Sequence, residues 1–524
     1  MPELRSEIAL PPPRREWRTP ALLLIAAFIA HGLAMAGVRH QRGQVTAYAF
    51  QSPDAAEYVA LARGLAWQGQ YVQLDAESHR LAGPDVWRTP GYPLFLAVAI
   101  KLAGESSLAL LFAQQIVAIA TVPLLWLVLR PLTRPAWACI AALAWCFDPF
   151  RLYYSLWLMS ETLFTFVLLA ACWAWIATKG SGFRAQGEGS GFRVQGSARG
   201  AGSPSSIRNP QSAIRNGPAF LLGLLSGLLV LIRPIAAPLP LLALIGVTVA
   251  AFSIRNPQST IRNCLLPAFA CLLGLALTLG PWLARNRVLS GHFAISCQSG
   301  ASFAYHKVVD VVLWSEGRPE YRFDPTATAE VRERIDARLR REWPQARSPA
   351  TPEELKTLTW QNLNFGKPVA VDPFTASSVL WSIGLDTLKS HPGAMVKCFA
   401  VQGAFMLIFP LGLVLWPPAG TGSAPFSMLL GGGAGMLARA LPPVIGAAYG
   451  ALALFVLLRL IIAVWRRRWP AGFFTLWPML LMFAFSLPSE DPRFRLPLVP
   501  LLWILAVASH GFALPAASRS NLSH

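Results

Sequence analysis

Apolar runs of helix length recur along the chain and alternate with polar turns. A helix needs about 20 mostly apolar residues to cross the hydrocarbon core of a bilayer. Segments of roughly this length lie at about 20–38, 107–129, 136–154, 162–178, 218–232, 235–252, 264–284, 441–465, 470–487 and 497–514. The pattern therefore predicts an all-α polytopic membrane protein with about ten transmembrane helices, within a range of about 10–13.

Two further apolar segments fit this pattern less simply. The segment 93–104 is too short to span, so we expect it to dip into the membrane or lie along its surface. Residues 395–416 are long enough to span. A crossing there would require another at 426–440 to keep Arg466-Arg467-Arg468 on the cytoplasmic side, and both alternatives stay open.

The positions of Arg and Lys set the expected orientation. The formal net charge is +19, and the basic residues cluster in short loops, which stay cytoplasmic. The N-terminus is therefore expected inside. Ala34-Met35-Ala36 resembles a signal-peptide cleavage site, but the length of the segment 20–38 favours a transmembrane helix. Because the Arg residues form no single patch interleaved with aromatic residues, we expect no nucleic-acid partner.

The chain is expected to divide into alternating membrane and loop regions. Two sequence repeats, 180–187 with 189–196 and 206–212 with 253–259, are interpreted as tolerated insertions in cytoplasmic loops. The expected regions are a cytoplasmic N-terminus (1–19), a core (20–178) with its first outer loop (39–92), a flexible basic loop (179–217), transmembrane helices (218–284), a large outer domain (285–394), a C-terminal transmembrane region (395–514) and a tail (515–524).

Neither disulfides nor a structural metal are indicated. The seven Cys residues lie mostly in apolar segments, and none belongs to a Cys-x-x-Cys motif or a Cys/His cluster with zinc spacing. In the large outer domain, Val331, Ile335, Leu339 and Trp343 recur at helical spacing among charged residues. This stripe is typical of the packed side of an amphipathic helix.

A short helix in the first outer loop carries the first candidates for chemistry. Ser52 is placed to cap it, Pro53 suits its first turn, and Asp54 lies where the helix dipole favours a carboxylate. Asp54, Glu57 and Tyr58 follow at i, i+3 and i+4, so one face presents two carboxylates and a phenol. The alternative is an ordinary amphipathic surface helix.

The predicted topology brings further charged residues to the same membrane face. Ionisable groups at that depth are costly and are therefore functional candidates. Acids next to arginines suit a reaction in which a carboxylate takes a proton from an acceptor hydroxyl while guanidinium groups hold a phosphate leaving group. The alternative is that they are interfacial residues or mutual salt bridges. These residues are Arg88, Glu161, Arg493 and Arg495.

Several motifs in order resemble those of GT-C membrane glycosyltransferases that use polyprenyl-phosphate sugars. The resemblance is closest to the branch of protein mannosyltransferase-like, aminoarabinose-transferase-like and lipopolysaccharide-core transferases. It covers about residues 20–510 without the repeat-bearing loops. The motifs are Asp54-x-x-x-Tyr58, Arg88-Thr-Pro-Gly-Tyr92-Pro93, Ser160-Glu161-Thr-Leu-Phe164, Arg233-Pro234, Pro281-Trp282-x-x-Arg285-Asn286, His391-Pro392 and Asp491-Pro-Arg493-Phe-Arg495-x-Pro497.

The resemblance implies a GT-C fold, a lipid-linked donor and a first-loop acid at the reaction centre, which is Asp54 here. The later family acid matches Glu161, implied to bind the acceptor or a cation such as Mg²⁺ or Mn²⁺. Some members have two adjacent acids in the first loop, whereas Ala55 follows Asp54 here, which argues against a metal at this position. Because the chain has only 26 acids and no cluster with metal-ligand spacing, no obligatory tightly bound metal is expected. Glu57 is the third catalytic candidate. The candidates for substrate binding are Arg88 and Arg493, for the donor phosphate, with Tyr58, Tyr92, Arg285, Asn286 and Arg495.

The sequence thus predicts an inverting glycosyltransferase at the outer face of a bacterial inner membrane. Its expected partners are a polyprenyl-phosphate sugar donor, membrane lipids and a lipid, glycan or protein acceptor. Three alternatives are a lipid or sugar transporter or flippase, a non-catalytic membrane scaffold, and a polymerase or ligase that consumes pyrophosphate-linked oligosaccharides. A transporter is disfavoured because the chain shows no clear repeat of helix sets.

Overall fold

The computed structural model describes residues 17–50, 52–72, 84–178, 216–252, 260–318, 325–343, 351–364, 371–408, 435–465 and 496–507. Every regular element in these ranges is a helix. Four of the described helices are long and apolar enough to cross a membrane, at Arg18–His40, Ser107–Leu129, Ser160–Thr178 and Leu265–Ser290. The predicted all-α polytopic membrane fold is confirmed.

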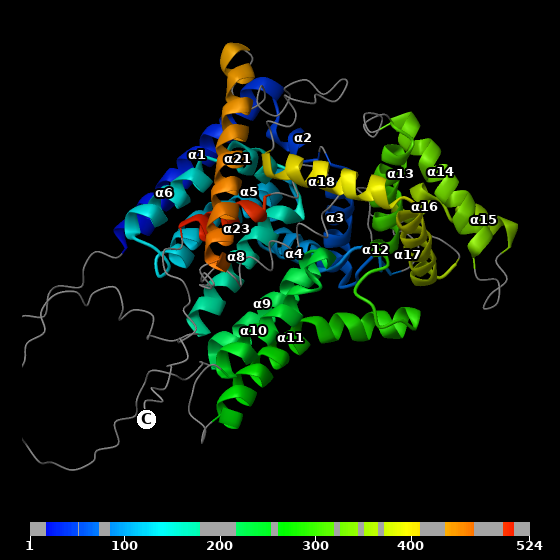
Figure 1. Ribbon diagram of the computed structural model, residues 1–524, viewed down its shortest axis with the longest axis horizontal. Coiled ribbons are helices and arrows are strands. Elements are labelled where there is room, and N and C mark those ends of the chain that lie inside the picture. The colour runs from blue at the N-terminus through cyan, green and yellow to red at the C-terminus, as the bar shows by residue number, and fades with distance from the viewer. Residues whose placement is uncertain are drawn as a thin grey trace, which may run out of the picture.

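An apolar bundle forms one side of the molecule (Figure 1). In it, α9 packs against both α8 and α11, and α5 packs against α1, α6 and α8. Its described helices with more than 13 residues are α1 (Arg18–Arg42), α5 (Ser107–Leu129), α8 (Ser160–Thr178), α9 (Asn216–Ile232), α10 (Leu239–Phe252), α11 (Thr260–Ser290) and α21 (Gly435–Trp465). Its shorter members are α2 (Val45–Ala49), α3 (Pro53–Arg63), η1 (Gly64–Gln68), α4 (Gly91–Ala103), α6 (Pro135–Cys146), α7 (Pro149–Ser155), η3 (Pro234–Ala236) and α23 (Leu498–Val507).

A group of mostly short helices, here called the polar domain, lies beside the bundle (Figure 1). It consists of α12 (Gln298–Ser302), η4 (Phe303–Val308), α13 (Val309–Ser315), α14 (Pro325–Glu342), α15 (Pro352–Thr357), α16 (Trp360–Asn364) and α17 (Pro373–Ser390). Val331, Ile335, Leu339 and Trp343 are buried in its core, so the predicted packing stripe is confirmed. The next helix, α18 (Pro392–Ile408), packs against α13 and against α21 and thus connects the two parts.

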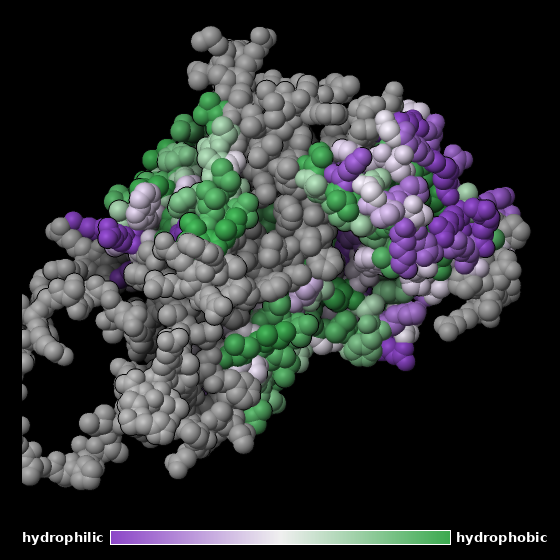
Figure 2. All heavy atoms as spheres, in the orientation of Figure 1, coloured by the Kyte–Doolittle hydropathy of each residue, from purple (hydrophilic) through white to green (hydrophobic). Residues whose placement is uncertain are grey.

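Surface polarity separates the two parts of the molecule. Figure 2 shows hydrophilic residues gathered over the polar domain and hydrophobic residues over α1 with α6 and over α10 with α11. On α1 the side chains of Leu22, Phe28 and Leu33 are at least 65% exposed. Large apolar side chains exposed on long helices are expected where the solvent is lipid, so this surface agrees with a multi-pass membrane protein.

Two local expectations were wrong. The helix predicted at 136–154 is two helices, because α6 ends at Cys146 and α7 begins at Pro149. The Asp148 carboxylate accepts hydrogen bonds from the backbone N–H groups of Phe150 and Arg151, which starts a new helix inside the apolar run. Ser52 occupies the N-cap position of α3, but its side chain makes no capping hydrogen bond.

Candidate active site

Helix α3 carries two of the predicted acids, Asp54 and Glu57. Pro53 occupies its first turn with Asp54, and Glu57 and Tyr58 follow one turn later on the same face. The helix continues into η1, where the returning chain crosses Gly64. A Cβ atom at Gly64 would lie 2.1 Å from the carbonyl oxygen of Val72. Glycine therefore allows the segment before Val72, which carries Tyr71, to fold back over this helix.

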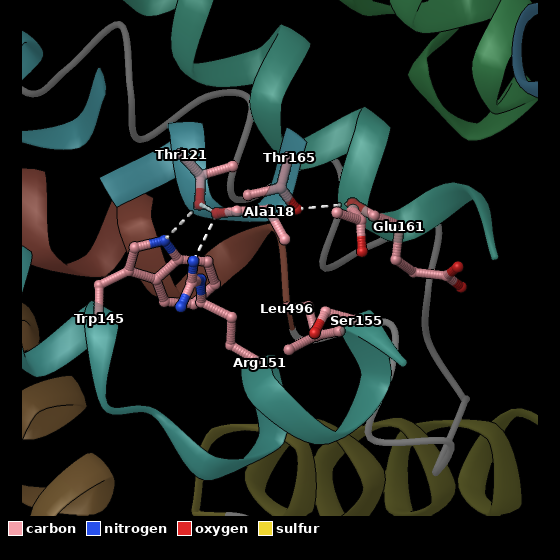
Figure 3. A pocket seen from close by; sticks show the side chains of 9 residues that line it. Ala118, Thr121, Trp145, Arg151, Ser155, Glu161, Thr165 and Leu496 are labelled. Carbon is pink, nitrogen blue, oxygen red and sulfur yellow. Dashed lines mark hydrogen bonds between the residues drawn. The ribbon is translucent and has the colours of Figure 1, made fainter. Parts of the chain in front are cut away.

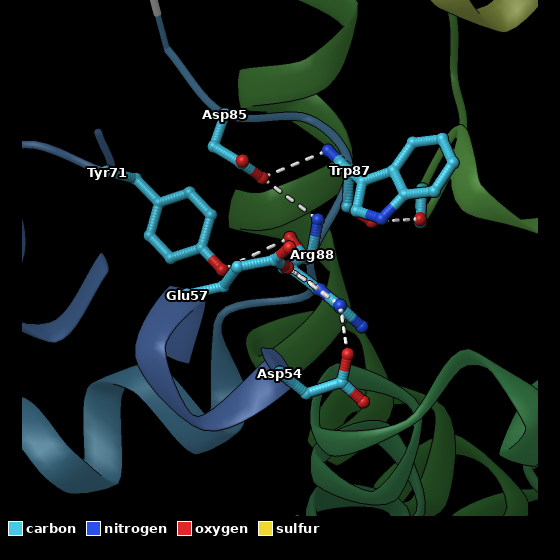
Figure 4. A network of polar contacts seen from close by, with 7 residues as sticks. Asp54, Glu57, Tyr71, Asp85, Trp87 and Arg88 are labelled. Atoms are coloured by element: carbon cyan, nitrogen blue, oxygen red, sulfur yellow. Dashed lines mark hydrogen bonds and ion pairs between the residues drawn. The ribbon is translucent and has the colours of Figure 1, made fainter. Parts of the chain in front are cut away.

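An extended segment delivers Arg88 to the acids. The Asp85 carboxylate accepts hydrogen bonds from the backbone N–H groups of Trp87 (3.0 Å) and Arg88 (2.9 Å). The Tyr71 hydroxyl donates to the Arg88 carbonyl (3.1 Å), and the Ser296 hydroxyl donates to the Trp87 carbonyl (2.5 Å). Backbone groups on both sides of the Arg88 Cα are thus bonded, so the position of its side chain is set before any substrate binds (Figure 4).

The Arg88 guanidinium joins both carboxylates of α3. Its Nη2 atom lies 2.6 Å from Asp54 Oδ1 and 2.7 Å from Glu57 Oε2, and its Nε donates to Glu57 Oε2 at 2.7 Å. The guanidinium carbon also lies 5.3 Å from the centre of the Tyr58 ring. Figure 4 shows the Arg88 side chain directed between the two acids. The structure therefore brings together Asp54, Glu57, Tyr58 and Arg88.

Burial and the charge of the ion-pair partner act in opposite directions on the pKa of Glu57 and on that of Arg88. The side chain of Arg88 is 8% exposed, that of Glu57 13% and that of Asp54 27%. Burial raises the pKa of Glu57, with the Arg88 charge opposing the shift. Burial would lower the pKa of Arg88, but the charges of Asp54, Tyr58 and Glu57 together keep that pKa well above its ordinary value. Arg88 therefore remains a cation, and Glu57 is the acid that protonates more easily than usual.

A second ion pair lies close by, between Glu161 and Arg233. Glu161 stands in the first turn of α8 and is 2% exposed, and Arg233 follows the last residue of α9. Their Oε1 and Nη1 atoms are 2.5 Å apart. Arg233 belongs to a family-like motif, yet the sequence analysis did not include it among the site residues. Its position directly after an apolar helix and before Pro234 was the signal.

Two tyrosines occupy the space near both ion pairs. The rings of Tyr58 and Tyr92 meet edge to face with centroids 4.9 Å apart. Burial raises the pKa of Tyr58, on which the charges of Arg88, Asp54, Arg233 and Glu161 also act. The Tyr92 hydroxyl donates to Gln114 Oε1 at 2.5 Å, and Tyr92 is fully buried. Tyr92 therefore packs behind Tyr58 and anchors it to α5.

Of the two predicted residues on α11, Arg285 approaches the site through Tyr71, whereas Asn286 bonds the loop after the helix. The Arg285 guanidinium lies 4.5 Å from the centre of the Trp282 ring and 5.3 Å from that of Tyr71. Asn286 is fully buried and donates to the carbonyls of Ala294 (2.8 Å) and Ile295 (3.3 Å). Its amide thus holds the loop after α11. Arg493 and Arg495 lie outside the described residues.

A small cavity lies beside the first turn of α8. It is lined by Thr121, Trp145, Arg151, Ser155 and the α8 residues Glu161, Thr162 and Thr165, among others. Figure 3 shows the Glu161 carboxylate turned away from Arg151. Arg151, which the sequence analysis did not single out, is buried and donates to the carbonyls of Cys146 (3.1 Å) and Ala118. Its contacts fasten α7 to α5 and α6.

The donor set at this site does not resemble a divalent-cation site. Within the described ranges, no three His, Cys, Asp or Glu side chains gather as metal ligands would. Asp54 and Glu57 instead share one guanidinium, and Glu161 is paired with another. A divalent cation would have to displace these arginines. We therefore assign no step to Mg²⁺ or Mn²⁺.

A family model matches part of the chain. Residues 87–181 match the family of dolichyl-phosphate-mannose-protein mannosyltransferases. The predicted resemblance is confirmed there. The matched segment contains Arg88, Tyr92 and Glu161 and leaves out Asp54, Glu57 and Arg233. Among curated proteins, no sequence matches this chain.

Two of the solved structures that resemble this chain are distant matches. ArnT from Cupriavidus metallidurans bound to undecaprenyl phosphate is 12% identical over 93% of this chain and 77% of its own, with a TM-score of 0.38. The Archaeoglobus fulgidus oligosaccharyltransferase tethered to an acceptor peptide is 14% identical over 94% of this chain, with a TM-score of 0.45. This chain spans about half of that protein, with 49% covered.

Proposed function

We propose that this protein is an inverting glycosyltransferase. It transfers a sugar from a polyprenyl-phosphate donor to a lipid, glycan or protein acceptor at the outer face of a bacterial inner membrane. The observation that carries the proposal is the Arg88 guanidinium held between Asp54 and Glu57. Arg88 also lies in the segment similar to dolichyl-phosphate-mannose-protein mannosyltransferases.

In the proposed reaction, Asp54 is the general base. It takes the proton of an acceptor hydroxyl, whose oxygen attacks the anomeric carbon of the sugar. The bond from that carbon to the phosphate oxygen breaks, and the bonding electrons leave with polyprenyl phosphate, which Arg88 holds with Arg285 and Arg493. A single displacement of this kind inverts the anomeric configuration, as it does in inverting glycoside hydrolysis.

The ion pairs support a mechanism in which binding of the donor phosphate weakens the hold of Arg88 on the general base, Asp54. A phosphate that binds Arg88 competes with the two carboxylates for the same N–H groups. Glu57 is the acid that yields more readily, because burial already raises its pKa and added negative charge raises it further. The side chain of Asp54 is more exposed than that of Glu57. Asp54 then faces the acceptor while its ion pair with Arg88 is weakened. We assign acceptor binding to Glu161, which is paired with Arg233.

The test is sugar transfer by the purified protein in lipid, assayed with a panel of polyprenyl-phosphate sugars and a cell-envelope extract. Asp54→Asn preserves shape and a hydrogen-bond acceptor for Arg88 but removes the base, so transfer should fall by about 10²–10⁴-fold. Asp386→Asn is the matched control, because that Asp pairs with Arg338 (3.2 Å) on the surface of the polar domain.

Each outcome has a definite meaning. Release of polyprenyl phosphate that depends on Asp54 but not on Asp386 supports the proposal. Native turnover in Asp54→Asn removes Asp54 from the mechanism. No release from any donor, together with lipid-phosphate binding that survives the mutation, overturns glycosyl transfer in favour of a flippase or a non-catalytic scaffold.

A further inference from the structure

Tyr71 lies between the two described arginines that the proposed function assigns to the donor phosphate. It is 7% exposed, and its hydroxyl donates to the backbone carbonyl of Arg88 at 3.1 Å. Its own carbonyl accepts the Asp85 N–H at 3.0 Å and an Arg285 N–H at 3.4 Å. One residue thus contacts Arg88, Arg285 and the turn that presents Arg88.

The Tyr71 ring makes a second connection. It meets the Trp282 ring edge to face with centroids 5.1 Å apart. The Arg285 guanidinium lies against both rings, 5.3 Å from the Tyr71 centroid and 4.5 Å from the Trp282 centroid. A guanidinium so placed over aromatic faces keeps its charge while its plane is restricted. Tyr71 therefore limits the orientation of Arg285 and the backbone position of Arg88.

We propose that Tyr71 is a positioning residue that sets the spacing of Arg88 and Arg285 for the phosphate of the lipid-linked donor. This inference rests on the proposed function. The Tyr71 side chain acts through the two arginines, since its hydroxyl is occupied by the Arg88 carbonyl. Loss of the hydroxyl leaves a buried carbonyl without this donor and lets the Arg88 segment shift, which weakens phosphate binding more than acceptor binding.

The test is Tyr71→Phe, which removes one hydroxyl and keeps the ring that packs against Trp282 and Arg285. We expect the KM for the donor and the Kd for polyprenyl phosphate to rise by about 3- to 10-fold, with the acceptor KM unchanged. The matched control is Tyr305→Phe. Tyr305 is fully buried and donates to Asp336 at 2.5 Å, but it belongs to the core of the polar domain.

The two variants separate positioning from general stability. Both should lower the unfolding temperature, whereas only Tyr71→Phe should change donor KM and lipid-phosphate affinity. Equal donor parameters in native protein and Tyr71→Phe, or equal changes in the two variants, overturn the inference. Binding is measured with polyprenyl phosphate alone in nanodiscs. If the native chain binds it but transfers no sugar, the failure lies in the proposed function and not in the role of Tyr71.

Discussion

Replacing Arg88 with lysine tests whether the fork of the guanidinium, and not charge alone, organises the site. The native guanidinium makes three contacts of 2.6–2.7 Å with Asp54 and Glu57, through two different nitrogens. Lysine keeps the positive charge but has one nitrogen on an unbranched stem, so it cannot reproduce this geometry. We expect Arg88→Lys to retain the pair with one carboxylate and lose the pair with the other.

The magnitude follows from the hydrogen bond that is lost. A hydrogen bond to a charged group contributes about 1.5–3 kcal/mol. If the same fork grips the donor phosphate in the transition state, kcat/KM for the donor should fall by about 10- to 150-fold. Arg334→Lys is the control, because Arg334 lies 2.6 Å from Glu316 but its side chain is 55% exposed. An exposed pair contributes little, so this variant should behave as the native protein.

The assay is donor-dependent release of polyprenyl phosphate, measured beside the unfolding temperature. A double-mutant cycle of Arg88→Lys with Glu57→Gln should show strong coupling, since the two side chains touch. Native kcat/KM and native unfolding temperature in Arg88→Lys would refute the reasoning. Additive effects in the cycle would show that Glu57 and Arg88 act independently.

Two further predictions concern packing and pH. In Gly91→Ala the added methyl would lie 2.7–2.8 Å from backbone atoms of Leu231 and Ile232, so the unfolding temperature should drop by the equivalent of about 1–3 kcal/mol. Gly32→Ala is the control, because no atom from outside its own stretch of helix lies within 4 Å of the added methyl. Because burial raises the pKa of Glu57, the stability of native protein relative to Glu57→Gln should fall as pH rises above about 4.5. The hydrogen bond from Arg334 lowers the pKa of Glu316, so stability relative to Glu316→Gln should instead fall as pH drops below about 4.5. Unfolding temperatures across pH that move in the same direction for both glutamates would contradict this assignment.

Helix positions could be predicted from the sequence where a long apolar run carries its own end signals. The helix expected at 107–129 is α5, Ser107–Leu129, and the Ser106 side chain caps it by accepting the Ala109 N–H. The prediction of one helix at 136–154 was wrong, because the apolar run continues across the break between α6 and α7. Asp148-Pro149 is a helix-start signal, and hydropathy alone does not register it.

The candidate site was predictable in its local part only. Helical spacing places Asp54, Glu57 and Tyr58 on one face, as the structure shows. That Arg88 binds both acids depends on a fold-back of the chain at Gly64 and on hydrogen bonds from distant residues. The pairing of Glu161 with Arg233 likewise joins two helices. A contact between two distant helices produces no periodic pattern in a single sequence. Only the order of the family-like motifs indicated that these residues would lie near one another.

The two ion pairs favour a site in which an arginine leaves its carboxylate when the donor binds. They fit less well with salt bridges that only stabilise the fold. Asp54 and Glu57 share Arg88, and Glu161 holds Arg233, so each described acid of the site already faces a cation. In the proposed reaction, an anionic donor that binds Arg88 takes the guanidinium from a carboxylate. Under the proposed function, that exchange would free an acid where a proton is accepted and so link donor binding to the activation of the acceptor. A purely structural salt bridge would gain nothing from an acid whose burial raises its pKa.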